Sequence, residues 1–229
     1  HTPTAMTPAD MDRVVAAFED AARRADRAGF DLVELHAAHG YLLTQFLSPL
    51  SNHRTDEFGG SYENRARFPL RVAQALRDAW PRTKALGVRF NGSDWVEGGI
   101  ALDEVTALGQ ALHDMGYDFL HLTSGGNVAQ AKIPGGEPGY QLRFAQAVKA
   151  ATPQANVMAV GMIFDPEQAE EIVRSGQADF IAIARAALDD PHWAHHAAVA
   201  LGEDEGLPVQ YRGAAKGVWP AYDRANTPA

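Results

Sequence analysis

Two histidines and a tyrosine stand close together in the segment "HAAHGY". His36 and His39 are three residues apart, and Tyr41 follows two residues later. Two imidazoles can both donate hydrogen bonds to one carbonyl or phenolate oxygen, and a neighbouring phenol can deliver a proton to carbon. The types and spacing of these residues therefore suit a site that holds and protonates a small substrate.

Spacing alone leaves other interpretations of the histidines open. One of the two can be a hydrogen-bonded core residue at the end of a strand. A zinc site would need a third ligand, such as His53, Glu34 or Asp56, and HxxH outside the HExxH frame is a weak metal signal. We therefore expect no metal site, while the core and substrate-holding interpretations both remain.

The chain around this segment alternates between strand-like and helix-like patterns. Short, mostly apolar runs, typical of strands buried on both faces, recur five times. Helical patterns lie between them, and the first has Thr7 as N-cap, Pro8 at its first position and Asp10 two residues later. The alternation predicts an α/β fold with a parallel sheet and right-handed crossovers. The expected strands lie near residues 31–36, 85–91, 117–123, 156–162 and 179–184.

Composition limits the classes of partner. The chain has 229 residues, of which 46% are hydrophobic and 21% charged, as is ordinary for a globular protein. Its net charge of −9 argues against nucleic acid as a partner. We expect no membrane association, because no run of about 18 apolar residues is present. The absence of cysteine excludes thiolate metal sites and, with no signal-peptide pattern at the start, favours the cytoplasm.

The histidine segment also carries a specific family resemblance. The chain is similar to the old yellow enzyme family, in the bacterial branch whose histidine pair reads HxxH, over "VELHAAHGYLLTQFLSPLSNHRTDEFGGSYENRARFPL". The likeness continues in register through "GVRFNGSDW", "HLTSGG", "VGMIFDPEQAEEIVRSGQADFIAIARAALDDPHW" and "PVQYRG". It implies an FMN-binding TIM (β/α)₈ barrel that reduces activated C=C bonds with NADPH or NADH, and hence a small-molecule alkene as substrate.

The resemblance implies roles for four residues. His36 and His39 would bind and polarise the carbonyl oxygen of the substrate and stabilise the developing enolate. Tyr41 would protonate the α-carbon after hydride has reached the β-carbon. Arg89, in the next strand, would face the pyrimidine edge of FMN and stabilise the reduced, anionic flavin. An arginine within an apolar strand needs an anionic partner in any case.

The same resemblance places the phosphate of FMN at the last two strands. Backbone N–H groups there, with Arg185 as a bidentate partner, would contact the phosphate. Ala184 departs from the family, which commonly has glycine at this point and therefore more backbone freedom. The residues that match cofactor-binding positions at this end are Gly161, Met162, Ala184 and Arg185, with Ser124 and Gly125 nearby.

The resemblance begins at the helix before the family's fourth strand. Residues 1–202 would hold strands 4–8 and their helices, so we expect strands 1–3 to come from a second chain or from a further segment. A five-stranded arc by itself would leave an edge strand and apolar surface exposed. Residues 203–229 form a tail in which Tyr211 and Arg212 resemble the segment that this branch sends into a neighbouring subunit's active site. We therefore expect a homo-oligomer, with Arg212 as a substrate contact.

Three other functions compete with this interpretation. An old-yellow-like barrel can act on aromatic or enoyl acyl-thioesters. An enzyme of the dienoyl-CoA reductase type is disfavoured, because those enzymes carry a cysteine-ligated cluster and this chain has no cysteine. The alternative from another class is a non-catalytic barrel fragment or structural subunit. Intact His36, His39, Tyr41, Arg89 and Arg185 argue against it, since a scaffold needs none of them at strand ends.

Overall fold

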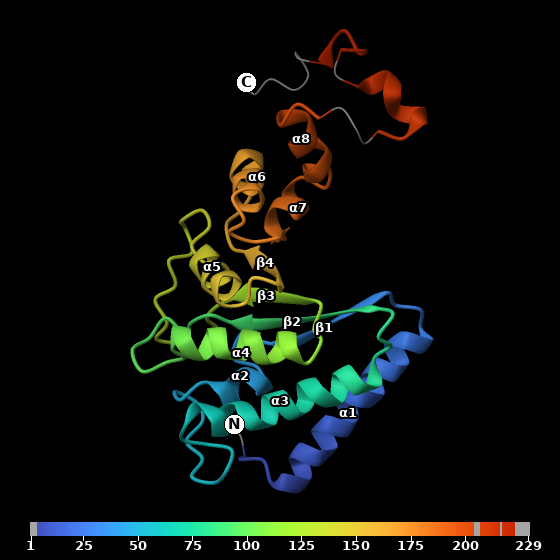
Figure 1. Ribbon diagram of the computed structural model, residues 1–229. Helices are drawn as coiled ribbons and strands as arrows, with labels where there is room; N and C mark the ends of the chain where they lie inside the picture. Colours follow the sequence, from blue (N-terminus) through green and yellow to red (C-terminus); the bar gives the residue numbers. More distant parts are fainter. Residues whose placement is uncertain (1–3, 204–206, 216, 223–229) are drawn as a thin grey trace.

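Five parallel strands form one sheet in the order of the sequence (Figure 1). The computed structural model describes residues 4–203, 207–215 and 217–222. The prediction of five consecutive βα units in an open arc of a barrel is confirmed. The strands are β1 (Leu32–Ala37), β2 (Ala85–Asn91), β3 (Phe119–Thr123), β4 (Asn156–Val160) and β5 (Phe180–Ala182).

Helices precede, connect and follow these strands. The first begins as predicted, because the Thr7 side chain accepts a hydrogen bond from the backbone of Asp10 and the Asp10 carboxylate accepts one from the backbone of Thr7. The helices are α1 (Pro8–Arg27), α2 (Leu42–Leu47), α3 (Tyr62–Ala79), α4 (Leu102–Asp114), α5 (Leu142–Ala151), α6 (Pro166–Arg174), α7 (Arg185–Asp189), α8 (Trp193–Ala200) and the 3₁₀ helix η1 (Val209–Ala214).

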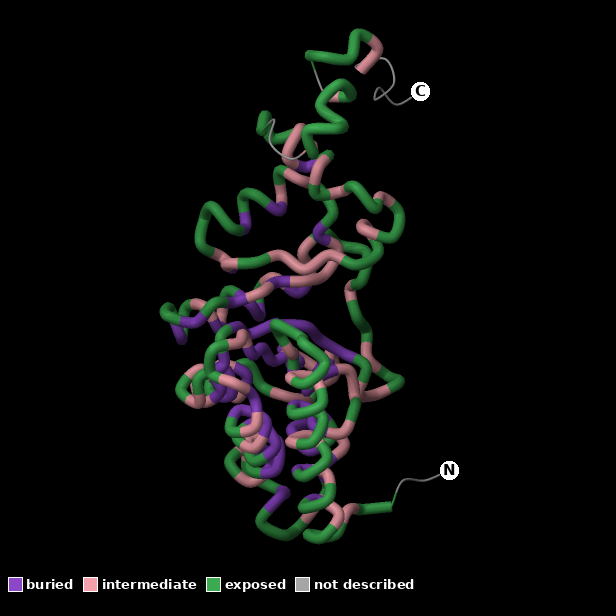
Figure 2. Tube along the Cα trace, turned by 90° about the vertical axis from the view of Figure 1, so that its right-hand side faces the viewer, coloured by how far each residue is buried: buried purple, intermediate pink, exposed green. Residues whose placement is uncertain are grey.

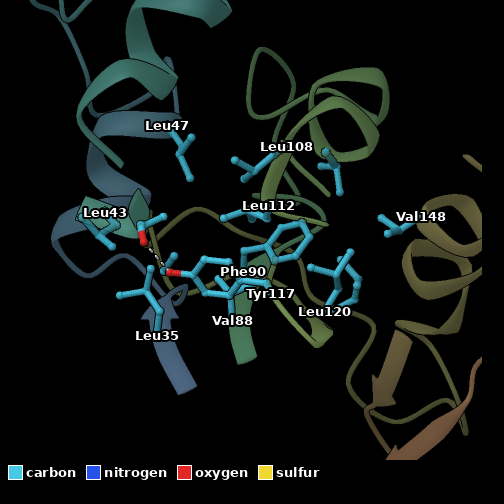
Figure 3. Packing of buried hydrophobic residues seen from close by; sticks show 14 of the residues in the cluster. Leu35, Leu43, Leu47, Val88, Phe90, Leu108, Leu112, Tyr117, Leu120 and Val148 are labelled. Carbon is cyan, nitrogen blue, oxygen red and sulfur yellow. Dashed lines mark hydrogen bonds between the residues drawn. The ribbon is translucent and has the colours of Figure 1, made fainter. Parts of the chain in front are cut away.

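One face of the sheet is buried under the helices. Alternate strand positions supply its apolar side chains, and fully burying one of them stabilises the fold by about 1.5–3 kcal/mol. Tyr117 joins this layer to α3 by donating a hydrogen bond to the carbonyl of Ala73 at 2.9 Å. Figure 3 labels Leu35, Val88, Phe90 and Leu120 from the strands, Leu43 and Leu47 from α2, Leu108 and Leu112 from α4, and Val148 from α5.

The opposite face carries polar side chains in register. His36 of β1 pairs with Arg89 of β2, and Arg89 pairs with His121 of β3. Two residues earlier on each strand, Glu34 pairs with Gly87. Because side chains alternate between the two faces of a strand, all of these residues lie on the same side of the sheet. In a closed barrel this side is the interior.

The last two strands are shorter than the sequence predicted. β4 was expected to reach 162 but ends at Val160, because Gly161 (φ 118°) and Met162 (φ 52°) adopt backbone conformations that a strand does not allow. β5 was expected over 179–184 and covers Phe180–Ala182, because helix α7 begins directly afterwards.

Burial decreases along the chain. Figure 2 shows buried residues concentrated around the first strands and a mostly exposed C-terminal region. Helix α7 and the 3₁₀ helix η1 contain no buried residue, and α8 contains one, Ala197. Within the described part of the chain, no helix has both the length and the hydropathy that a bilayer crossing requires.

Candidate active site

The two histidines and the tyrosine come together at the C-terminal end of β1. The ring centroids of His36 and His39 are 5.2 Å apart, and those of His36 and Tyr41 are 5.4 Å apart. His36 is the fifth residue of β1, while Tyr41 is the N-cap of α2 and makes no side-chain capping bond. The Tyr41 side chain is 63% exposed, so its hydroxyl is available to a ligand.

A tight turn between β1 and α2 brings His39 back toward His36. His39 has a left-handed backbone (φ 59°), as does Gly40 (φ 74°). A Cβ on Gly40 would lie only 2.2 Å from the carbonyl oxygen of Gly126, so the turn packs directly on the backbone that follows β3. Glycine is therefore required here for a close approach as well as for its conformation.

Hydrogen bonds from the neighbouring strand ends fix His39. Its backbone N–H donates to Oδ1 of Asn91 at 3.2 Å, and its ring Nε2 lies 2.9 Å from Oγ1 of Thr123. Asn91 in turn donates from Nδ2 to the carbonyl of Gly125 at 2.8 Å. The ends of β1, β2 and β3 are thus tied together around this imidazole, which leaves Nδ1 of His39 for a ligand.

The surroundings of both imidazoles favour their neutral form. Burial, with a further contribution from the positive charge of Arg89, lowers the pKa of His39 to about 4. The same two causes lower the pKa of His36. A neutral imidazole with one protonated nitrogen donates a hydrogen bond to a carbonyl oxygen without presenting a full charge to it.

Arg89 lies beside the histidines and is poorly satisfied by the protein. Its Nη2 is 3.4 Å from Oγ1 of Thr123, and its Nε is buried without an acceptor. No carboxylate of the described residues lies within ion-pair distance of it. A half-buried guanidinium in this state suits an anionic or carbonyl-rich ligand above the strand ends.

A cavity of about 620 Å³ extends from Arg89 to the ends of β4 and β5. This volume lies within the usual range for cofactor sites, about 300–1,000 Å³. Both polar and apolar side chains line it, from the histidine turn to helix α8. The lining residues include His39, Arg89, Thr123, Ser124, Tyr140, Gln141, Gly161, Met162, Ala184, Arg185, Asp189 and Trp193.

The far end of this cavity contains the residues predicted to bind phosphate. Gly161 and Met162 form the strained turn after β4, and a Cβ on Gly161 would lie 2.5 Å from Nε2 of Gln141. Ala184 is the N-cap of α7 and Arg185 is its first residue. Within the described part of the chain, the Arg185 side chain makes one hydrogen bond, a 3.7 Å contact with Sδ of Met162, so this exposed guanidinium can meet an anion.

Four residues predicted from the sequence are absent from the lining of this cavity. His36 and Tyr41 lie next to its edge, because their rings approach each other and His36 approaches the lining residue His39. The other two are Gly125 and Arg212. Gly125 (φ 77°) faces Ile133, whose Cδ1 would be 2.5 Å from a Cβ, and is absent from the lining. Arg212 lies in the exposed 3₁₀ helix η1, which is distant from the sheet in Figure 1. A role for Arg212 within this chain's own cavity is not supported by its position.

The sequence interpretation missed the polar residues that hold the site together. Gln141 is 4% exposed, accepts a hydrogen bond from Oγ of Ser124 at 2.5 Å and donates to the carbonyl of Val160 at 3.2 Å. Thr123 and Asn91 anchor His39 as described above. Thr123 and Asn91 could have been found from their position in the sequence, because both come at the ends of predicted strands.

Metal binding has no support in the geometry. Over residues 4–203, 207–215 and 217–222, no three His, Asp or Glu side chains gather in a way that could hold a metal ion. The pair of histidines is instead surrounded by a hydroxyl, a phenol and a guanidinium.

Comparison with known proteins identifies sequences similar to this chain. A model of the NADH:flavin oxidoreductase / NADH oxidase family matches residues 1–204. An NADPH dehydrogenase of Geobacillus sp. (strain WCH70) is 43% identical over 212 residues, which are 92% of this chain and 60% of the relative. An NADPH dehydrogenase of Bacillus subtilis (strain 168) is 42% identical over 92% of this chain and 61% of its own length. The chain therefore spans about 60% of the length of these relatives.

Solved structures agree with this match. Morphinone reductase in complex with tetrahydroNAD superposes with a TM-score of 0.72 at 27% identity, covering 100% of this chain and 61% of that one. A 2-naphthoyl-CoA reductase in complex with 2-naphthoyl-CoA superposes with a TM-score of 0.79 at 30% identity, covering 87% of this chain and 30% of that one.

Proposed function

The chain belongs to the NADH:flavin oxidoreductase / NADH oxidase family, and on this premise we propose that it supplies the C-terminal part of an FMN-dependent enzyme. That enzyme reduces activated C=C bonds with NADPH or NADH. The observation that carries the proposal is the convergence of His36, His39 and Tyr41 at the end of β1, where His39 lines a cavity of about 620 Å³ together with Arg89.

The histidine pair binds the activating oxygen of the substrate. Neutral imidazoles at His36 and His39 donate hydrogen bonds to a carbonyl oxygen, and these bonds strengthen as negative charge develops on it. The lowered pKa of His39, about 4, keeps this donor neutral throughout the physiological range. The anchoring of His39 by Thr123 and Asn91 fixes the donor before the substrate arrives.

Tyr41 is the proton donor. Its ring lies 5.4 Å from that of His36, so a carbonyl held by the histidines places the adjacent α-carbon within reach of the Tyr41 hydroxyl. The Tyr41 side chain makes no capping hydrogen bond at the start of α2. The phenol transfers its proton to carbon and recovers it from solvent, to which it is exposed.

The residues of the cavity fit FMN. Bound there, the flavin would take hydride from the nicotinamide and pass it to the β-carbon of the alkene. Arg89 would meet the pyrimidine edge, because its buried Nε has no acceptor among the described residues. Arg185 and the backbone of Gly161, Met162 and Ala184 hold the phosphate end. Among the described residues, the exposed Arg185 guanidinium has no competing acidic partner.

The site is completed by protein outside this chain's five strands. Residues 1–202 form the C-terminal barrel part, and the polar face bearing Glu34 and His36 is exposed along β1. Strands from a second chain or a further segment cover this face and close the barrel. The tail assigned to residues 203–229 lies partly outside the described residues, which here are 203, 207–215 and 217–222. Its described part forms a subunit contact, through which Arg212 reaches the site of a neighbouring copy in a homo-oligomer. The enzyme acts in the cytoplasm.

A second candidate substrate class is an aromatic or enoyl acyl-thioester. The observation that favours it is the likeness to a 2-naphthoyl-CoA reductase, at 30% identity and a TM-score of 0.79. A thioester carbonyl presents the same acceptor to His36 and His39. The two classes are distinguished by comparing kcat/KM for a cyclic enone with that for an enoyl-CoA thioester.

Native mass spectrometry of the purified protein, followed by denaturation, tests the proposal. The expected result is release of this chain, of the polypeptide that completes the barrel, and of one FMN per site. Anaerobic NADPH should then bleach the flavin, and 2-cyclohexenone or an enoyl thioester should restore its colour. A protein that carries no flavin and oxidises no NADPH would support the alternative of a non-catalytic structural subunit.

A further inference from the structure

On the same face of the sheet as Arg89 lie two side chains that the proposed reaction does not use. Nδ1 of His121 is 2.9 Å from Oε2 of Glu34. His121 belongs to β3 and is 6% exposed, whereas Glu34 belongs to β1, so their contact passes over β2. An ionised carboxylate can only accept, and Nδ1–H of the histidine is therefore the donor.

A glycine in β2 leaves room for the ring of Phe119 on this face of the sheet. Gly87 pairs in register with Glu34 on one side and with Phe119 on the other. A Cβ on Gly87 would lie 1.9 Å from Cζ of Phe119, so the aromatic ring already occupies the space above this residue. Any side chain at position 87 would displace the ring and disturb the floor on which Glu34 and His121 meet.

Glu34 is the carboxylate that balances the charge of Arg89. Burial lowers the pKa of Arg89, and the charge of Glu34 is the largest of the effects that oppose this change. Burial and the charge of Arg89 also lower the pKa of His36, and the charge of Glu34 opposes this change. The carboxylate acts at a distance, because no ion pair within 4.0 Å joins it to Arg89. Its position, and so its effect, depends on the hydrogen bond from His121.

We propose that Glu34 and His121 form a positioning pair that sets the redox potential of the bound flavin through Arg89. The inference rests on the proposed function. The negative charge of Glu34 offsets part of the field with which Arg89 stabilises the reduced, anionic flavin. His121 fixes the carboxylate by its Nδ1–H and thereby keeps this offset constant. The pair keeps the reduced cofactor from being stabilised so far that it becomes a poor hydride donor.

The test is the flavin midpoint potential of the complete, FMN-loaded protein and its variants, measured anaerobically by equilibration with a redox dye. Glu34→Gln keeps the shape of the side chain and removes its charge. We expect the ratio of affinities for reduced over oxidised FMN to rise about tenfold, equal to about +30 mV for a two-electron couple. The matched control, Asp31→Asn, removes a carboxylate from the exposed residue just before β1 and should leave the potential unchanged.

A second variant keeps the inference testable even where Glu34→Gln does not fold. His121→Asn retains the carboxylate but removes its ring partner, and should shift the ratio in the same direction by about threefold. An unchanged potential in either folded, flavin-loaded variant would overturn the inference, as would a shift of the opposite sign. Failure of the proposed function is a separate result, because then the wild-type protein itself binds no FMN.

Discussion

The two ends of the cavity are built in different ways. At the substrate end, strands β1 to β3 lie over a buried layer, and His39 is held by bonds to Asn91 and Thr123. At the phosphate end, β5 has three residues and helix α7 buries none. Among the described residues, the Arg185 side chain hydrogen-bonds to Sδ of Met162 alone.

The difference indicates which groups are preorganised by this chain alone. Rigid donors next to reacting atoms contribute most when they need no rearrangement, and the histidine turn meets this condition. An exposed arginine gains its order from the ligand or from a covering chain. Single substitutions at the substrate end should therefore change catalysis or FMN binding strongly, and those at the phosphate end should change FMN binding weakly.

The largest effect is expected at Tyr41. Tyr41→Phe removes the proton donor and should slow reoxidation of reduced flavin by an enone by about 10²–10⁴-fold, the usual contribution of general acid catalysis. Reduction of the flavin by NADPH should be unchanged. Stopped-flow measurement of the two half-reactions separates them, and Tyr62→Phe in α3 serves as control. Equal loss in both half-reactions would contradict the proton-donor role.

Arg89 should have the next largest effect. Arg89→Met removes a half-buried cation and should weaken FMN binding by about 10–100-fold, because a hydrogen bond to a charged group contributes about 1.5–3 kcal/mol. The control is Arg23→Met, which removes the same charge from an exposed position of α1. Fluorescence titration of the apoprotein with FMN measures both. Equal affinities for the two variants would remove Arg89 from the flavin site.

A smaller effect is expected at Arg185, and it sharpens the contrast between the two ends. Arg185→Met should weaken FMN binding by about tenfold, because solvent competes for this exposed guanidinium. Riboflavin, which has no phosphate, should bind the variant and the wild type equally. Arg174→Met in α6, where the arginine pairs with Glu171, is the control. A loss as large as that of Arg89→Met would mean that the phosphate end is preorganised too.

The pH dependence of stability should show the smallest effect. The pKa of His39 is about 4 in the folded protein, against an ordinary value of 6.5. The unfolded chain therefore takes up the proton first, and stability should decrease as the pH falls from 6.5 toward 4. His39→Asn, which tolerates the left-handed backbone, should flatten this slope in urea unfolding, whereas His53→Asn at an exposed position should not. Identical slopes would contradict the burial of a neutral imidazole.

Local signals made much of this molecule predictable. Thr7 with Asp10 marked the start of α1, and the five apolar runs marked the strands, because caps and periodicity depend on neighbours in sequence. Helix α2 was missed, since a six-residue apolar run does not distinguish a short buried helix from a turn. The early end of β4 at Gly161 was also missed.

Long-range choices of partner could not be read from the sequence. Nothing in "DLVELH" indicates that Glu34 reaches across β2 to His121, because that contact depends on the register of three strands. Gln141 lies 17 residues after its partner Ser124 and is similarly invisible to local patterns. Such contacts between strand ends decide how the site is held, and they require the fold.

The central claim is that His36 and His39 together hold the oxygen of the substrate. The most direct measurement is a titration of the flavin-loaded protein with a para-substituted phenol, followed by the long-wavelength charge-transfer absorbance of phenolate on flavin. Loss of both donors in His36→Ala/His39→Ala should weaken binding by more than about 100-fold, while His53→Ala should bind as the wild type does. Undiminished phenol binding in the double variant would contradict the account.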